Sequence, residues 1–228
     1  MQRYSFYLIT LLIIDLIFAM TRKQTIICSV LSAIAVLAAF AFFNFIYPYH
    51  VHYQEQMQLF RFSADYFRDS VAVPGGFGDW IGGFLVQFFY YAPVGAMILA
   101  ALLGLIQLLT WKNMEKGSFA SYPLSFLPAM AMFLFFCDEN GLVTAAIALA
   151  ASLAAAFMLM KVRRTGLRSV VTILLMPVMY MLFGSISVLV PVIVAFNSFI
   201  RKESRKTILI FCAAALAVAV ALPLAARG

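Results

Sequence analysis

Residues able to carry acid–base or binding chemistry gather in one stretch of the chain, 50–91, which holds both histidines and four of the nine acidic residues. General acid–base catalysis uses positioned groups that donate and accept protons, so a pair of carboxylates is the natural candidate. Glu55 and Asp65 are therefore the predicted catalytic residues. The predicted substrate-binding residues are Arg61, Asp69, His52 and Trp80. The structural alternative is a solvated helix face on which Arg61 and Asp65 pair four residues apart.

His50, His52 and Glu55 form the one combination in this stretch that suggests a metal site. On an extended strand the two imidazoles would share a face, because side chains alternate along a strand. A structural zinc site needs four ligands, and no fourth ligand stands at a convincing spacing. We predict no metal site here.

The glycine cluster Gly75-Gly76-Phe77-Gly78 resembles a phosphate-binding loop only in composition. A P-loop follows a strand and ends in Lys-Ser or Lys-Thr, and neither feature is present. The cluster, with Pro74 before it, predicts a turn. The sequence therefore predicts no bound cofactor.

The composition identifies the solvent of this protein as a bilayer. Of the 228 residues 65% are hydrophobic and only 11% are charged, whereas soluble domains are about 45–50% apolar and about 25% charged. The apolar runs are long and continuous rather than alternating, which favours helices over a barrel. We predict an all-α, polytopic transmembrane helical bundle whose first partner is the lipid bilayer.

The net charge of +7 has a specific distribution, because the cations stand at the ends of apolar runs. Such clusters mark the cytoplasmic side of a membrane protein, so the charge is a topology signal and no nucleic-acid partner is expected. The clusters are Arg22 with Lys23, Lys112 with Lys116, 161–168 and 201–206. The predicted location is a bacterial inner membrane.

The apolar runs predict about seven crossings after Met20, and an eighth if the first segment inserts. Residues 1–20 are either an N-terminal helix or an upstream extension, and 21–228 form the transmembrane domain. The predicted spans are 26–47, 80–111, 121–136, 142–160, a pair within 169–200 that turns at Phe183-Gly184-Ser185, and 207–224. The arms of that pair either span or form a re-entrant hairpin. The 142–160 helix carries an alanine-rich face suited to close packing.

The acidic loop 49–80 is predicted to lie outside, between the first two long spans. Its first half, 53–70, places Met57, Phe60, Ala64 and Phe67 on one helical stripe, so we expect an extracytoplasmic amphipathic helix. Asp79 is expected to cap the following helix. That helix exceeds one span, and Gly82-Gly83, Pro93 and Gly95 are its predicted kink points.

The stretch 54–91 resembles the first outer loop of an uncharacterised family of multi-pass bacterial inner-membrane proteins. The matching residues are Gln56 and Gln58 before Leu59-Phe60, then Asp65-Tyr66-Phe67, Pro74-Gly75-Gly76 and the aromatic run 87–91. That family is distantly similar to the type-C glycosyltransferase membrane fold, whose first outer loop carries an acidic residue. The resemblance implies Glu55 or Asp65 for that role. It also implies longer relatives with a further extracytoplasmic helical region.

Three functions follow from these features, in decreasing order of preference. The first is a scaffold or subunit of a membrane complex, with other membrane proteins as partners. The second is a glycosyltransferase-like enzyme that acts on a lipid-linked substrate at the outer face. The third is a transporter, which ranks last because ionisable residues are almost absent from the spans after Met20. Whether the protein is an enzyme stays open at this stage.

Overall fold

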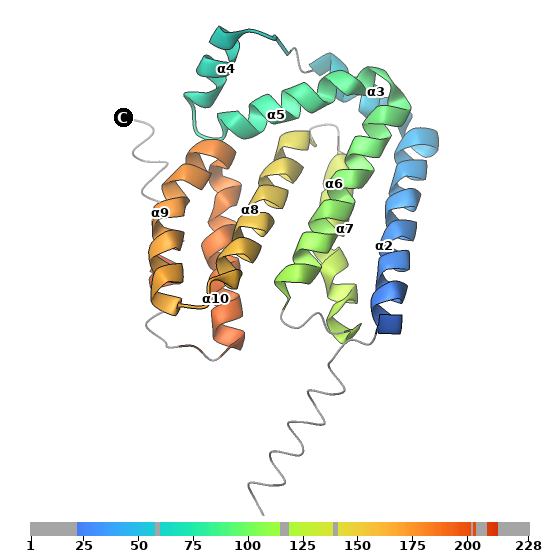
Figure 1. The fold of residues 1–228 in the computed structure, drawn as a ribbon. Helices are drawn as coiled ribbons and strands as arrows, with labels where there is room; N and C mark the ends of the chain where they lie inside the picture. Colours follow the sequence, from blue (N-terminus) through green and yellow to red (C-terminus); the bar gives the residue numbers. More distant parts are fainter. Residues whose placement is uncertain are drawn as a thin grey trace, which may run out of the picture.

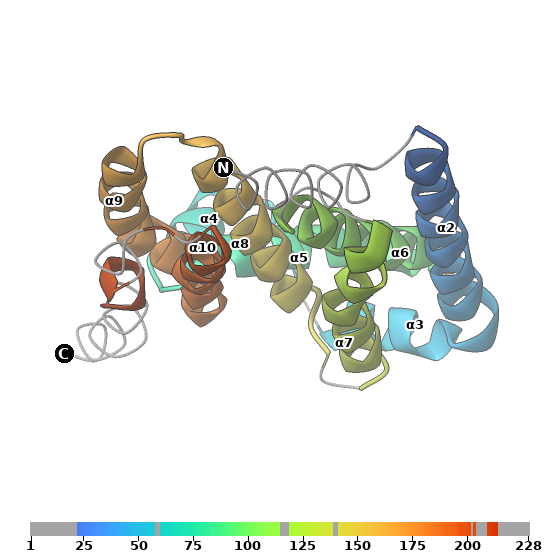
Figure 2. The ribbon, with the colours of Figure 1, turned by 90° about the horizontal axis from the view of Figure 1, so that it is seen from below.

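The computed structural model describes residues 22–57, 60–114, 119–138, 141–201, 203 and 209–213, and within them every regular element is helical. Segment 1–20, most of the expected 207–224 helix and the 115–118 turn lie outside the described residues. The helices of the bundle lie side by side in Figure 1, and in the view from below α2 and α9 stand at opposite edges (Figure 2). They are α2 (Arg22–Ala41), α6 (Ala92–Asn113), α7 (Phe126–Phe136), α8 (Val143–Lys161), α9 (Thr165–Phe183) and α10 (Leu189–Ile200).

Four stretches of the described chain are long and apolar enough to cross a membrane: Lys23–Ile46, Ala92–Asn113, Val143–Lys161 and Thr165–Ile200. The fourth confirms the predicted turn, because Gly184 has φ +70° and a short 3-10 helix η6 (Gly184–Val188) separates α9 from α10. The start of α7 is later than expected, since two 3-10 turns, η4 (Phe119–Ser121) and η5 (Pro123–Ser125), precede it. The number of seven to eight crossings stays a prediction.

The two ends of the bundle differ in charge. α6 and α8 finish with Lys112 and Lys161, while α9 follows Arg164 and α10 is followed by Arg201. All these termini lie at the lower end in Figure 1, which we call the basic end. The opposite end, which carries Asp65, Asp69, Asp79 and Asp138, is the acidic end.

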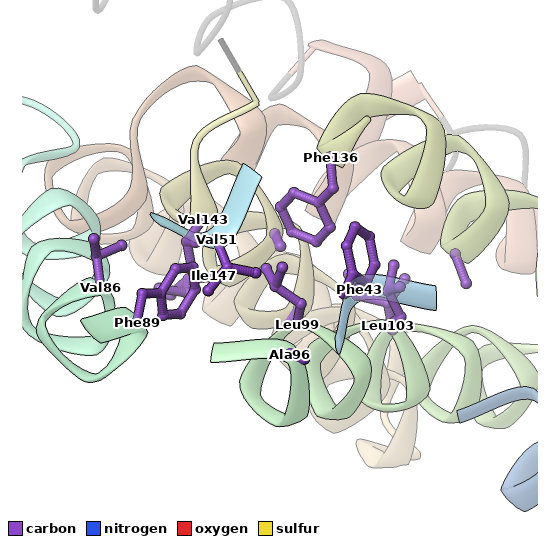
Figure 3. Packing of buried hydrophobic residues seen from close by; sticks show 14 of the residues in the cluster. Phe43, Val51, Val86, Phe89, Ala96, Leu99, Leu103, Phe136, Val143 and Ile147 are labelled. Carbon is purple, nitrogen blue, oxygen red and sulfur yellow. The ribbon is translucent and has the colours of Figure 1, made fainter. Parts of the chain in front are cut away.

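The core lies where α6 meets α2, α7 and α8. Figure 3 shows Phe43, Leu99 and Leu103 packed beside Phe136. The alanine-rich face of α8 is buried as expected, at Ala146, Ala148, Ala150 and Ala156. Small side chains allow helix backbones to approach closely where no hydrophobic force drives association in lipid.

The single helix expected over 53–70 is wrong. The chain forms α3 (Pro48–Met57), leaves helical geometry at 60–63 and begins again as α4 (Ala64–Val71). Ser63 is extended, with φ −141°, and its hydroxyl accepts a hydrogen bond from the Tyr66 N–H at 3.1 Å. A serine N-cap satisfies a free N–H of the first turn, so the helix starts anew at this residue.

The long helix expected over 80–111 is also divided. α5 (Gly76–Val86) lies across the helix ends at the acidic end (Figure 1), and η2 (Gln87–Tyr90) links it to α6. The chain turns at Tyr91, which is extended, and not at the predicted kink glycines. Pro93 lies in the first turn of α6, where a proline is tolerated because its missing N–H has no helical partner.

Asp79 does not cap α5, because the N-cap position belongs to Gly75. The helix begins three residues before Asp79, so this carboxylate lies within the first turn. There it still interacts favourably with the positive end of the helix dipole. The Asp79 side chain is exposed, so its carboxylate can bind a group outside α5.

Candidate functional site

The structure distributes the six predicted site residues over separate elements. Glu55 and His52 lie on α3, which packs on η2 and α6, whereas Asp65 and Asp69 lie on α4, which packs on α5. α3 is fixed in place by Gln54, whose side-chain amide donates to the Gly141 carbonyl. Figures 1 and 2 both show α3 and α4 well apart. The structure therefore does not bring Glu55 and Asp65 together as a carboxylate pair.

The expected pairing of Arg61 with Asp65 is not observed. Arg61 precedes the Ser63 cap and is not helical, so the four-residue spacing no longer places the two side chains on one helix face. In the part of the chain that the structure describes, these two exposed residues form no ion pair with each other.

Trp80 belongs to an aromatic cluster that joins the 60–63 link to α4 and α5. Its ring stacks on Phe84, with centroids 6.2 Å apart, and meets Phe60 and Phe67 edge-on at 5.5 and 5.1 Å. Edge-to-face pairs of this kind each contribute about 0.5–1.5 kcal/mol beyond area burial. The cluster holds α4 against α5. Trp80 therefore has a role in packing, in addition to the predicted role in substrate binding.

A glycine face on α5 brings that helix close to α8 and α9. A Cβ built on Gly82 would lie 2.5 Å from the Thr144 hydroxyl, and one on Gly78 would lie 3.4 Å from the Phe183 ring. Gly75, with φ +88°, would place its Cβ 3.4 Å from the Cα of Gly184. Glycine is required where backbones approach this closely or φ is positive. The glycines thus serve close packing of α5 as well as the expected turn.

The Gly75 N–H donates to the Met181 carbonyl at 2.9 Å, which fastens the start of α5 to the end of α9. Beside this contact lies a cavity of about 400 Å³ at the acidic end, which we call the Asp79 cavity. Its walls come from the start of α5, the start of α8, the end of α7 and the α9–α10 turn. None of the six predicted site residues lines it.

Four polar side chains converge on the Asp79 cavity: Asp79, Thr144, Tyr180 and Ser185. Asp79 and Ser185 are exposed, while Tyr180 is buried with 7% of its surface accessible. Within the described chain none of these four side chains forms a hydrogen bond to protein. Buried polar groups in native proteins are ordinarily paired, so the unpartnered side chain of the buried Tyr180 is the strongest sign of a ligand, and the other three polar side chains stand beside it at the same cavity.

The donor set defines what this cavity can bind. An ionised carboxylate accepts hydrogen bonds, and the three hydroxyls both donate and accept. The lining includes a single carboxylate and no cation, so it is suited to hydroxyl groups and unsuited to a phosphate. Phe135 and Phe183 add apolar wall. One carboxylate does not make the pair that the sequence analysis required for acid–base catalysis.

Sequence reasoning treated Asp79 only as a helix cap and passed over Thr144, Tyr180 and Ser185. A signal was present, because a threonine, a tyrosine and a serine stand near the same predicted ends of three apolar segments. Polar residues at the same ends of neighbouring apolar segments lie at the same depth. The sequence could not show that α5 lies across the ends of these helices and brings Asp79 to the same cavity.

Comparison with known proteins gives a family and no further relative. A model of a family of unknown function (DUF6057) matches residues 22–228, which include every described residue. No curated protein and no solved structure matches the chain. The match extends well beyond the first half, to which the resemblance in the sequence was confined.

Proposed function

The chain belongs to the DUF6057 family, whose function is unknown, and from this premise we propose that it is an integral membrane protein that binds a sugar-bearing lipid at the Asp79 cavity. Four apolar stretches of spanning length support the membrane location. The observation that supports a ligand is that four polar side chains without a protein partner line one cavity.

The membrane in this proposal is the inner membrane of a bacterium, and the basic end faces the cytoplasm. The support is the collection of lysines and arginines at one end of the bundle. The Asp79 cavity then faces the opposite side, at the level of lipid headgroups.

The headgroup is neutral and carries several hydroxyls. Asp79 would accept from sugar hydroxyls, and the hydroxyls of Thr144, Tyr180 and Ser185 would complete the hydrogen bonds. An anionic headgroup would place its charge against the Asp79 carboxylate without a compensating cation. A sugar also has apolar C–H faces that fit the Phe135 and Phe183 walls.

The test measures lipid preference in nanodiscs that contain equal amounts of glucosyl-diacylglycerol and phosphatidylglycerol. Native mass spectrometry of the released protein is expected to show enrichment of the glycolipid. Asp79→Asn replaces a charged acceptor by a neutral one, and Tyr180→Phe removes a hydroxyl. The advantage of a hydrogen bond to a charged acceptor over a neutral one is worth on the order of tenfold in affinity. The Asp79→Asn variant should therefore lose most of the enrichment, and Tyr180→Phe a smaller part.

Asp69→Asn is the matched control, because Asp69 is an exposed carboxylate on α4 outside the cavity. It should keep the full preference for glycolipid. Equal loss in Asp69→Asn and Asp79→Asn would assign the preference to surface charge and refute the proposal. The scaffold, glycosyltransferase and transporter hypotheses stay predictions of the sequence, and the catalytic role of Glu55 and Asp65 stays with them.

A further inference from the structure

A second hollow lies inside the row of helices, between α2, α6 and α7, and shares no lining residue with the Asp79 cavity. Its volume is about 390 Å³. Small residues make the room, among them Ala38 and Ala39 on α2, Gly104 on α6 and Ala129 on α7. We call this hollow the α2–α7 groove. No ionisable side chain lines it, so any ligand there is neutral.

The groove has one polar patch, formed by Ser32 and Gln107. Both are buried, with 7% and 2% of their surfaces accessible. The Ser32 hydroxyl donates to the Gln107 side-chain oxygen at 3.0 Å and lies 2.8 Å from the Tyr122 hydroxyl. The Tyr122 hydroxyl in turn donates to the Cys28 carbonyl at 2.7 Å. The hydroxyl hydrogens of Ser32 and Tyr122 are therefore both donated within the protein.

The Gln107 side-chain amide, in contrast, keeps a donor that is not used. The Gln107 side-chain nitrogen carries two hydrogens, and within the described chain it donates one hydrogen bond, to the Ser125 hydroxyl at 2.9 Å. The Ser125 hydroxyl passes its own hydrogen to the Tyr122 carbonyl at 2.6 Å. One N–H of a nearly inaccessible amide is thus left without an acceptor beside an apolar hollow. An unmade bond of this kind costs about 1–3 kcal/mol, which an acceptor on a ligand would recover.

The position of the patch limits the ligand further. Gln107 stands six residues before the end of α6, which is ~9 Å at 1.5 Å per residue. The groove extends along α2 from Ser32 to Ala39, which is ~10 Å, and reaches Phe42 in the next turn of the chain. The free N–H therefore lies within the apolar layer, and a hydrocarbon chain has room to lie along the helices above it.

We infer that the α2–α7 groove binds a neutral lipid that places a carbonyl oxygen on the free N–H of Gln107 and an apolar chain along α2. Isoprenoid quinones and acyl esters share this chemistry. The site is independent of the sugar-lipid proposal, because the two hollows share no lining residue.

The experiment adds decylubiquinone to the full chain in nanodiscs and follows the fluorescence of Trp111, with Trp80 replaced by Phe. Trp111 packs edge-on against Tyr122 at 5.2 Å between ring centroids, so it reports on the patch. Ala38→Phe fills the groove from its exposed side, and Ala33→Phe adds the same ring at an exposed alanine of α2 that does not line it. Gln107→Leu removes the donor.

Saturable quenching is expected in the parent protein and in Ala33→Phe. Ala38→Phe should weaken it at least tenfold, and Gln107→Leu about fivefold, the loss that corresponds to one neutral hydrogen bond. Unchanged quenching in Ala38→Phe would overturn the groove as the site. Unchanged quenching in Gln107→Leu, with loss in Ala38→Phe, would overturn the carbonyl contact.

The natural source is identified from lipids that remain with protein extracted directly in polymer discs. A redox-active absorbance lost in Ala38→Phe and kept in Ala33→Phe identifies a quinone. Loss of a specific ester lipid on the same comparison identifies an acyl ester. Equal lipid content in the two variants would refute the inference.

Discussion

Polar side chains have protein partners at one end of the α9–α10 hairpin, whereas those that line the Asp79 cavity at the other end lack them within the described chain. At the basic end Arg168, with 1% of its side chain accessible, pairs with Glu203 and donates to Ser198, and its guanidinium stands 5.9 Å from the Phe211 ring. At the acidic end the turn meets α5 through the glycines Gly75 and Gly184, and the neighbouring polar side chains have no protein partner.

The comparison separates a polar group that another side chain pairs from one that a ligand could pair. Removing a charge from water is expensive unless it is paired, and the half-buried Glu203 supplies the pairing charge for the buried Arg168, whose Nε has no hydrogen-bond partner within the described chain. Tyr180 lies on the same helix as Arg168 and is also buried, yet it lines the Asp79 cavity and its side chain has no hydrogen-bond partner within the described chain. Burial alone does not distinguish the two, whereas the charged partner of Arg168 and the cavity beside Tyr180 do.

The largest contrast between the ends is expected in chemical labelling. In a background with the native cysteines replaced, Ser63→Cys at the acidic end and Arg163→Cys at the basic end are both exposed positions. An impermeant maleimide added to right-side-out vesicles should label the first and spare the second until the membrane is permeabilised. The reverse pattern would invert the assignment of the two faces.

Loss of Glu203 should give the largest change in stability. Glu203→Ala leaves the buried Arg168 charge uncompensated, and breaking a buried pair in this way costs about 3–5 kcal/mol. Unfolding in mixed detergent micelles measures the difference, with Arg163→Ala at an exposed cation as the control. The double variant Arg168→Met with Glu203→Leu should recover much of the loss. Equal stability of Glu203→Ala and Arg163→Ala would show that the ion pair of Arg168 with Glu203 does not stabilise the fold.

At the acidic end the corresponding test is a pair of glycine substitutions on α5. Gly82→Ala forces a Cβ to within 2.5 Å of the Thr144 hydroxyl, and overpacking of this kind costs about 1–3 kcal/mol. Gly78→Ala meets its nearest atom at 3.4 Å and gains helix propensity of up to about 1 kcal/mol. The same unfolding measurement compares them. If Gly82→Ala were as stable as Gly78→Ala, α5 would not be held by close approach.

Continuous apolar runs bounded by cations were sufficient to predict the all-helical bundle, the α8 boundaries and the turn at Gly184. These features depend on local composition, which a single sequence records. The same information failed for 53–70, because the apolar stripe continued across a break between α3, which ends at Met57, and α4, which Ser63 caps. Local capping and the tertiary contacts of α3 outweighed the periodicity.

The candidate site was missed for a different reason. The sequence analysis ranked residues by their charge in the polar loop, so Glu55, Asp65 and Arg61 came first. The Asp79 cavity depends on α5 lying across the ends of α8 and α9, a long-range arrangement made possible by glycines at close contacts. Their helical spacing, Gly75, Gly78 and Gly82, was visible in the sequence, but its partner surfaces were not.

The smallest expected effect concerns the cysteine at the turn after α7. Burial raises the pKa of the Cys137 thiol, because the thiolate loses hydration there. A thiol with a raised pKa holds less thiolate at a given pH, so alkylation at pH 8 should be several times slower than at Ser63→Cys in the same protein. A rate profile against pH should therefore have its midpoint above the usual value of about 8.5. A midpoint at or below that value would show that this turn is hydrated, and that the acidic end is more open to water than its packing indicates.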